Sequence, residues 1–324
     1  MIKRLFLLFL CFFNAAWVFS EETPYDIIVD GEGRGDYRSI GEAVKSVRAF
    51  DPRGTVTIFI REGFYKEKIL LPPEVCNVVF IGENRDKTII NYDDHANING
   101  MGTFKTFTVK VQGKDILFEN LTIENSAEQL GQAVAVHIEG DRVVFRNCRF
   151  LGNQDTVYAG SSECRQYFEN CYIEGTTDFI FGPSTAWFEN CEIHCKKNSY
   201  ITAAATPEKI RFGYIFNNCR VTAAEGVSKV YLGRPWRPYA MTLFMNCSLP
   251  EAITPSGWDN WRNPENEKTS RYMEYNNTGA GADTSKRVKW SKILTDGEAA
   301  GYTIENVLEG CDGWDPGSVK AFVK

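Results

Sequence analysis

The sequence of 324 residues offers little that could bind a metal ion. Only three histidines occur, His95, His137 and His194, and they lie far apart. None of the ten cysteines forms a CxxC pair. Structural zinc sites need closely spaced cysteine and histidine ligands. The spacings therefore predict no metal site, and we interpret His137 and His194 as structural residues.

Positive charge is also in short supply. The chain carries 36 Lys and Arg against 42 Asp and Glu, a formal net charge of -6. Nucleic-acid binding depends on a basic surface that faces the phosphates, so no nucleic-acid partner is expected. With 43% apolar and 24% charged residues, the composition is that of a globular protein. It does not suit a collagen-like, coiled-coil or multi-span membrane protein.

Long apolar runs are missing apart from one at the N-terminus, which is too short to span a membrane. Lys3 and Arg4 precede this run, it ends at Phe13, and a small-residue cleavage site follows. The pattern predicts a secretory signal peptide over residues 1–20. Residues 21–324 would then form a single domain, exported to the periplasm or the exterior and without a membrane attachment. Loss of two positive charges gives this part a net charge of -8.

An irregular repeat organises the middle of the chain. Each copy reads Phe, any residue, Asn, and the Asn is followed by Cys in every copy but the first. The asparagines of successive copies are Asn120, Asn147, Asn170, Asn190, Asn218 and Asn246. They are separated by 27, 23, 20, 28 and 28 residues. Repeats of this length indicate a solenoid, a propeller or an array.

The residues around each copy alternate between apolar and polar, which is typical of short strands. No amphipathic helix of 10–15 residues separates the copies, so a doubly wound sheet is not favoured. Strands stacked coil upon coil, about 4.8 Å apart, form a parallel β-helix. A propeller usually keeps a steadier and longer period and is the second choice. We expect the asparagines to stack in a turn, where this residue tolerates left-handed geometry.

The cysteines of the repeat are expected to form an inward column of small apolar side chains. Nine cysteines remain after signal cleavage, so at least one thiol is unpaired. A disulfide between neighbouring coils stays possible at this stage.

One helix is signalled near the start of the domain. Ser39 and Glu42 match a capping box, and Ala43, Val44 and Val47 continue an apolar face. Such a short helix could cap the open N-terminal end of the solenoid and cover its strand edge. Residues 250–300, richer in Asn, Gly, Pro and charge, are expected to form loops and a poorly repetitive tail.

Three polar segments interrupt the repeat. They are GQAVAV at 131–136, GNQDTVY at 152–158 and GTTDFIFG at 175–182. Gln132 and Gln154 are 22 residues apart, and Asp155 and Asp178 are 23 apart. Since one coil takes about that length, the spacing allows two amides and two carboxylates to meet on one face. Taken alone, an Asp or Gln in a β-solenoid is more often a turn residue that bonds local backbone.

Together with LGRPW at 232–236, these segments resemble the four signature segments of pectin methylesterases, also called pectinesterases. GFYKE at 63–67 and EYNNTG at 274–279 are similar to further motifs of the family. The resemblance covers most of residues 25–315 in family order, and the one departure, Val157 in place of Leu, is conservative. It implies an all-β, right-handed, single-stranded parallel β-helix that acts without a metal or organic cofactor.

The resemblance also implies a catalytic role for five residues. Asp178 would be the nucleophile and Asp155 the general acid and base. Gln132 and Gln154 would stabilise the oxyanion, and Arg234 would complete the site. Chemically these roles are consistent, because an arginine holds a carboxylate ionised whereas a nearby anion raises the pKa of a second carboxyl group.

Four aromatic residues are candidates for binding the sugar rings of a substrate. The resemblance assigns such a role to Trp236 and Phe104, and we expect Tyr158 and Phe181 to extend the same surface. The implied partner is methyl-esterified homogalacturonan (pectin), from which the enzyme would release methanol. We expect the protein to act as a monomer.

Three other functions stay open on the residues alone. A pectate lyase, which typically needs Ca²⁺, would yield an unsaturated product. A polygalacturonase would create new reducing ends through its carboxyl groups. A non-catalytic carbohydrate-binding solenoid would bind pectin without turnover. Release of methanol without shortening of the polymer distinguishes the methylesterase from all three.

Overall fold

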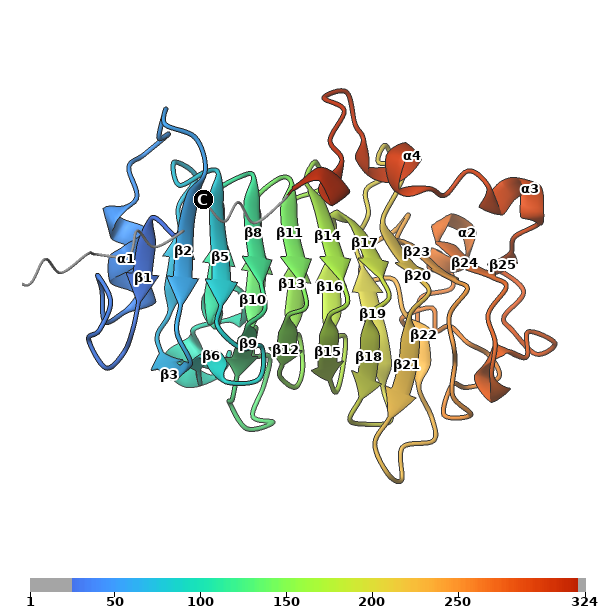
Figure 1. The fold of residues 1–324 in the computed structure, drawn as a ribbon. Helices are drawn as coiled ribbons and strands as arrows, with labels where there is room; N and C mark the ends of the chain where they lie inside the picture. The colour runs from blue at the N-terminus through green and yellow to red at the C-terminus, as the bar shows by residue number, and fades with distance from the viewer. Residues whose placement is uncertain (1–24, 320–324) are drawn as a thin grey trace, which may run out of the picture.

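The computed structural model describes residues 25–319, so the signal peptide predicted at 1–20 lies outside the described residues. Three parallel sheets are stacked in register along one axis (Figure 1). The seven coils from β2 to β22 each contribute one strand to each sheet. This is the parallel β-helix that the repeat predicted. Between residues 25 and 319 no helix is long and apolar enough to cross a bilayer.

The first sheet has eleven strands and runs the whole length of the fold, in front in Figure 1. Its strands are β1 (Ile27–Val29), β2 (Val56–Ile60), β5 (Val78–Gly82), β8 (Ile116–Glu119), β11 (Val143–Arg146), β14 (Arg165–Glu169), β17 (Thr185–Glu189), β20 (Tyr214–Asn217), β23 (Met241–Met245), β24 (Arg271–Tyr275) and β25 (Lys292–Ile293).

The second and third sheets have seven strands each. The second comprises β3 (Gly63–Lys66), β6 (Thr88–Tyr92), β9 (Thr122–Asn125), β12 (Arg149–Leu151), β15 (Tyr172–Gly175), β18 (Glu192–Cys195) and β21 (Arg220–Ala223). The third comprises β4 (Ile69–Leu71), β7 (Val109–Val111), β10 (Val136–Ile138), β13 (Val157–Ala159), β16 (Ile180–Gly182), β19 (Tyr200–Ala204) and β22 (Tyr231–Gly233).

The phenylalanine of each repeat points into the coil and stacks on its equivalents above and below. The strand register pairs Phe145 with Phe118 on one side and with Phe168 on the other. Ring centroids along the ladder are 4.7, 5.2, 5.0, 4.6, 4.4 and 4.4 Å apart for the successive pairs from Phe80 to Phe244. A one-residue slip would turn every such ring outward, so the ladder fixes the register of the first sheet.

The asparagine of each repeat occupies a left-handed turn between the first and second sheets. All six have φ between 47° and 60°. Asn147 Nδ2 donates a hydrogen bond to Asn120 Oδ1 at 2.9 Å, which links side chains of successive coils. The sequence-based prediction of stacked, left-handed asparagines is therefore confirmed.

The repeat cysteines form the predicted inward column. The five of them are at most 1% exposed, and their thiols donate to main-chain carbonyls, as from Cys148 Sγ to Phe118 O at 3.5 Å. All nine cysteines of the described residues are free thiols. The column is thus a packing feature and contains no disulfide.

Helix α1 (Ile40–Ser46) covers the N-terminal end and packs against β1 and β4. Ser39 Oγ accepts the amide of Glu42 at 3.1 Å, as the capping box predicted. The first two amides of the helix donate instead to the carboxylate of Glu67, each at 3.0 Å. Only the Ser39 half of the predicted capping box is therefore formed, and a carboxylate from the next coil accepts the amides of Ile40 and Gly41.

The chain after β25 forms a tail along the outer face of the first sheet (Figure 1). Its elements are α3 (Asp296–Ala299), α4 (Ile304–Leu308) and η4 (Pro316–Ser318). Two short helices lie earlier in the C-terminal loops, α2 (Asn266–Thr269) and η3 (Ala280–Ala282). Two more precede β7, η1 (Ile98–Gly100) and η2 (Thr103–Lys105). Leu308 and Trp314 pack against the sheet, and Asp312 forms ion pairs with Arg142 and Arg165 at 2.8 and 2.6 Å.

Replacing one ring of the ladder should destabilise the fold. We expect Phe168→Ala to lower the free energy of unfolding by about 3–5 kcal/mol, because it leaves a cavity between Phe145 and Phe188. Denaturant unfolding measures this change. Phe64→Ala is the matched control, since Phe64 also lies in a strand but is 63% exposed. Equal effects of the two substitutions would contradict the importance of the ladder.

Candidate active site

Two buried aspartates occupy the same position in successive coils. Asp155 precedes β13, and its amide donates to Thr177 O at 3.1 Å. Asp178 precedes β16, and its amide donates to Tyr200 O at 2.9 Å. In a parallel ladder this pattern puts Asp155 level with Asp178, one strand spacing of about 4.8 Å away. The structure thus brings the two candidate carboxyl groups together.

Both aspartates have a left-handed backbone, with φ of 66° at Asp155 and 50° at Asp178. Aspartate and asparagine are the non-glycine residues that adopt this conformation most readily. Asp155 is only 7% exposed and Asp178 only 5%. Buried carboxyl groups are costly, and such local cost is typical of functional sites.

Arg234 binds Asp178 with both arms of its guanidinium group. Nε donates to Oδ1 at 2.9 Å and Nη2 to Oδ2 at 2.6 Å. Arg234 follows β22, and its amide donates to Thr202 O of the neighbouring strand at 2.9 Å. The signature LGRPW therefore delivers its arginine to the second of the two carboxyl groups.

The two carboxyl groups differ in their electrostatic surroundings. Burial raises the pKa of Asp155 well above its usual value, and the negative charge of Asp178 raises it further. Burial also raises the pKa of Asp178, but the hydrogen bonds and charge of Arg234 oppose this rise. The pair is thus polarised, with the proton favoured on Asp155 and the negative charge on Asp178.

The two glutamines lie beside the carboxyl groups on neighbouring coils. The amide of Ala133 donates to Gln154 O at 3.0 Å, which puts Gln132 level with Gln154. The side chain of Gln154 is hydrogen-bonded to Asp155, an interaction that favours the charged form and lowers the pKa of Asp155. Both glutamines are partly exposed. The Gln154 amide thus reaches the pair, and the backbone register sets Gln132 one coil away from Gln154.

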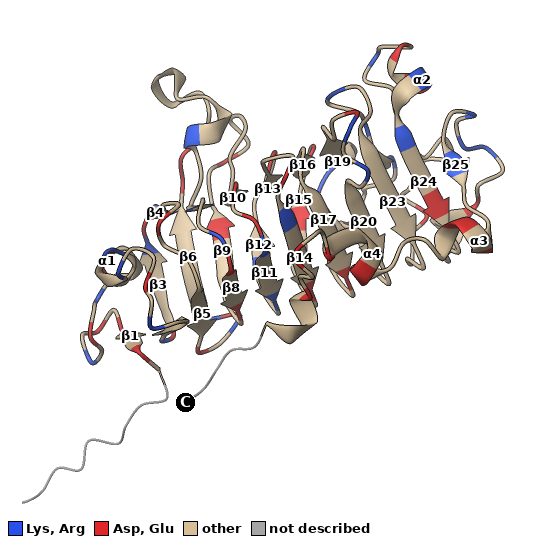
Figure 2. Ribbon diagram, turned by 90° about the horizontal axis from the view of Figure 1, so that it is seen from above, with Lys and Arg blue, Asp and Glu red and all other residues tan. Residues whose placement is uncertain are grey.

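The four candidate sugar-binding residues form one continuous aromatic row, but Phe181 is only 4% exposed and packs beside its neighbours instead of offering a ring face. The centroid of Phe181 is 5.9 Å from that of Trp236 and 4.8 Å from that of Tyr158. The Tyr158 ring is 5.0 Å from that of Phe104, which is 45% exposed. Figure 2 shows raised loops on both sides of β13 and β16. One group lies beside β6 and β10, and the other lies near β19 and α2.

Two aromatic contacts of Arg234 escaped the sequence analysis. Its Cζ atom lies 3.9 Å from the ring centroid of Tyr200 and 3.8 Å from that of Trp261. Tyr200 opens β19, and Trp261 lies in a loop of the non-repetitive region. No spacing or motif connects either residue with Arg234, so only the folded chain reveals them.

Histidines do not contribute to this pair of carboxyl groups. His137 is 1% exposed and its Nε2 lies 2.8 Å from Glu139 Oε1, and His194 Nδ1 lies 2.8 Å from Thr222 Oγ1. Within residues 25–319, no group of three His, Cys, Asp or Glu side chains is arranged to hold a metal ion. The contacts agree with the structural interpretation of both histidines.

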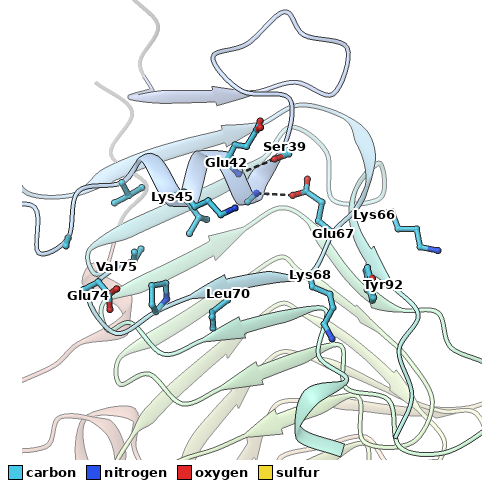
Figure 3. A pocket seen from close by; sticks show the side chains of 15 residues that line it. Ser39, Glu42, Lys45, Lys66, Glu67, Lys68, Leu70, Glu74, Val75 and Tyr92 are labelled. Carbon is cyan, nitrogen blue, oxygen red and sulfur yellow. Dashed lines mark hydrogen bonds between the residues drawn. The ribbon is translucent and has the colours of Figure 1, made fainter. Parts of the chain in front are cut away.

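A separate cavity of about 720 Å³ lies at the N-terminal end, between α1, β3 and β4. Figure 3 shows Lys45 of α1 together with Lys68, Leu70 and Val75 around it. None of the nine site residues predicted from the sequence lines this cavity. The polar site over the third sheet is distinct from it.

A row of neighbouring aromatic rings, tilted to one another, suits a long substrate built from sugar rings. An unequal carboxyl pair suits acid–base and nucleophilic chemistry. Fold and site together define a polysaccharide-modifying enzyme of the parallel β-helix class. The profile of the pectinesterase family matches residues 26–311. The chain belongs to the pectinesterase family, and it is a carboxylic ester hydrolase with pectin methylesterase activity on homogalacturonan.

Known proteins support this assignment over nearly the whole chain. Pectinesterase 31 of Arabidopsis thaliana is 39% identical over 87% of this chain and 91% of its own length. The pectin methylesterase structure from carrot has a TM-score of 0.84 and 34% identity, covering 88% of this chain and 93% of that one. A pectin methylesterase solved in complex with a hexasaccharide has a TM-score of 0.77 and 28% identity, covering 90% and 98%.

Other relatives are longer and carry a double name. A pectinesterase/pectinesterase inhibitor of Brassica campestris is 35% identical over 87% of this chain but only 52% of its own length. The chain thus spans about half the length of such relatives.

Neutralising Asp155 should stabilise the fold. A carboxyl group whose pKa is raised by burial favours folding below its unfolded pKa of about 4, and this contribution is lost as pH rises through the folded value. We therefore expect Asp155→Asn to have a higher melting temperature than the parent at neutral pH, with a gap that shrinks on acidification.

The matched control is Asp312→Asn. Arg165 lowers the pKa of Asp312, so this substitution should reduce the melting temperature at neutral pH. Thermal scans across a pH series check both signs. A destabilised Asp155→Asn protein at neutral pH would contradict the assigned direction of the pKa shift.

Proposed function

We propose that Asp178 and Asp155 are the nucleophile and the general acid and base of pectin methyl ester hydrolysis. The observation that carries this assignment is the bidentate contact of Arg234 with Asp178 alone of the pair. It favours the ionised form of Asp178, whereas burial and the neighbouring anion favour the protonated form of Asp155. Carboxyl groups whose surroundings separate their pKa values in this way commonly divide acid and nucleophile roles.

In the first half-reaction, a carboxylate oxygen of Asp178 attacks the carbonyl carbon of a galacturonate methyl ester. The carbonyl oxygen becomes an oxyanion, which accepts N–H bonds from the amides of Gln132 and Gln154. The carbon–methoxy bond then breaks, and methoxide leaves as methanol with the proton of Asp155. An anhydride joins Asp178 to the substrate, so one difficult step becomes two easier ones.

In the second half-reaction, Asp155 is ionised and acts as a general base. It takes a proton from water, which attacks the galacturonyl carbon of the anhydride. The tetrahedral intermediate uses the same amide donors and collapses to free galacturonic acid, which then loses its proton to solvent. Asp178 leaves as a carboxylate that Arg234 stabilises, and Asp155 holds the proton for the next cycle. Atoms and protons balance without a metal ion or cofactor.

Substrate binding is assigned to the aromatic row of Phe104, Tyr158 and Trp236, with buried Phe181 supporting the rings of Tyr158 and Trp236. The row crosses several coils, since Tyr158 and Phe181 are paired in the strand register. Flat apolar ring faces suit the faces of pyranose rings and do not depend on the charge of the galacturonate carboxyl groups. A hexasaccharide bound to a related pectin methylesterase is consistent with a site that spans several sugars.

Export of the protein is proposed as well. Pectinesterases act on the cell wall, outside the cell, and the positively charged start with its apolar run at residues 1–20 has the pattern of a signal peptide. Residues 21–324 would then work as one β-helix domain, and as a monomer. Mass spectrometry of the secreted protein, which should begin at Glu21, and light scattering test these two points.

Removing the nucleophile should abolish turnover without loss of fold. We expect Asp178→Asn to lower methanol release from esterified pectin by at least about a thousandfold. Asparagine accepts the left-handed backbone at this position, as the repeat asparagines show. Methanol is measured enzymatically, and thermal melting reports the fold.

Asp115→Asn is the matched control for this substitution. Asp115 is likewise left-handed, with φ of 58°, and it is also held by two arms of an arginine, Arg142. No hydrogen bond or ion pair joins Asp115 to either carboxyl group of the site, so activity should persist. Retained activity in Asp178→Asn would overturn the nucleophile assignment.

Removal of an oxyanion donor should affect chemistry more than binding. We expect Gln132→Ala to lower kcat by about 10²–10³ with little change in KM. Gln129→Ala, an exposed glutamine in the same loop, serves as the control and should leave both constants unchanged. A raised KM with normal kcat in Gln132→Ala would make this residue a substrate-binding group instead.

A further inference from the structure

The guanidinium group of Arg234 lies between two aromatic rings. Its Cζ atom is 3.9 Å from the ring centroid of Tyr200 and 3.8 Å from that of Trp261. Two rings this close to one carbon cannot share one side of it, because each ring needs about 3.5 Å of van der Waals thickness. Both faces of the guanidinium plane are therefore covered.

The two rings come from unrelated parts of the fold. Tyr200 belongs to β19 and is paired in register with Tyr231 of β22, the strand that Arg234 follows. The rings of these tyrosines are stacked at 5.2 Å, which supports the Tyr200 side of the sandwich. Trp261 closes the other side from the loop between β23 and α2.

The loop that carries Trp261 is held in an uncommon conformation. Trp261 and Arg262 both have positive φ, 60° and 55°. The amide of Trp261 donates to Asp259 Oδ1 at 2.7 Å, and the amide of Asp259 donates to Gly233 O at 3.1 Å, next to Arg234. Bulky residues with positive φ persist only where surrounding contacts maintain them, and they cluster at functional sites.

A covered guanidinium group is restricted in its orientation. With a ring on each face, it cannot rotate out of its plane without displacing one of them, so its N–H edge stays directed at Asp178. Cation–π attraction favours this placement, and it is strongest where water is excluded. The side chain of Arg234 is only 21% exposed, which limits hydration as an alternative.

We propose that Tyr200 and Trp261 are positioning residues, which hold the guanidinium group of Arg234 in the plane that presents two N–H donors to Asp178. This inference rests on the proposed role of Asp178 as nucleophile. Neither ring needs to touch the reacting ester, because each acts through Arg234. The sandwich therefore widens the pH range in which the nucleophile is ionised.

The charged and titratable groups around Asp178 allow the sign of this effect to be stated. Asp155 lies on the preceding coil, Asp259 and Tyr272 on the C-terminal side, and Tyr200 on the next strand. Arg234 is the cation that opposes the rise of the pKa of Asp178. Loss of its alignment should raise that pKa, and the acid limb of activity should move to higher pH.

The main test is the pH profile of kcat/KM for Trp261→Leu with esterified pectin. We expect the acid limb to move up by about 0.5–1 pH unit and activity on that limb to fall roughly 3- to 10-fold. Trp261→Phe retains a ring face and should restore much of the original profile. An unmoved acid limb in folded Trp261→Leu would refute the proposal, even if KM rises.

Trp236→Leu is the matched control. Trp236 belongs to the aromatic row and lies beside Phe181, and its contacts do not include the Arg234 guanidinium. It should raise KM without moving the acid limb. If Trp261→Leu gives this same pattern, Trp261 is a sugar platform and not a positioning residue.

Tyr200, on the opposite face of the Arg234 guanidinium group, supplies an independent test. This test also decides whether the rings position Arg234 if Trp261→Leu does not fold. Tyr200→Leu should move the acid limb in the same direction, whereas Tyr200→Phe, which keeps the ring, should not. An unmoved limb in Tyr200→Leu would refute the sandwich. Failure of the catalytic assignment is distinguishable, since it would appear as activity in Asp178→Asn.

Discussion

Stacking of successive coils in a single register is the constraint on which the site depends. Side chains alternate along each strand, so a slip of one residue would exchange inside and outside for a whole coil. Two features prevent such slips. Inward phenylalanine rings stack on one another, with the centroids of Phe145 and Phe168 5.0 Å apart, and the asparagine turns are left-handed. Asp155 and Asp178 therefore stand level with each other although 23 residues of chain separate them.

A rigid coil can carry groups that would be costly elsewhere. Two carboxyl groups are buried on adjacent strands, and burial raises the pKa of each. The backbone cannot move apart to relieve their repulsion, because continuous ladders of the three sheets hold the strands. Arg234 stabilises the negative charge of Asp178 alone through its bidentate contact. In the proposed mechanism, this difference lets Asp178 attack while Asp155 transfers a proton.

Arg234 links the regular and the irregular parts of the molecule. Its backbone continues the third sheet, and Tyr200 on one face also belongs to that sheet. Trp261 on its other face comes from a loop outside the repeat. The site is thus built by coils that give spacing and by one C-terminal loop that gives orientation. Stability of that loop, held through Asp259, is therefore relevant to chemistry as well as to folding.

Periodic and local features were readable from the sequence. The repeat, the asparagine turns and the cysteine column follow from side-chain period and intrinsic turn preference, and the signature segments indicated the family. Only the tertiary structure determined two other features. The carboxylate of Glu67 accepts hydrogen bonds from α1, and the rings of Tyr200 and Trp261 flank Arg234. These contacts join residues far apart in the chain with no repeating interval between them, so no one-dimensional pattern encodes their meeting.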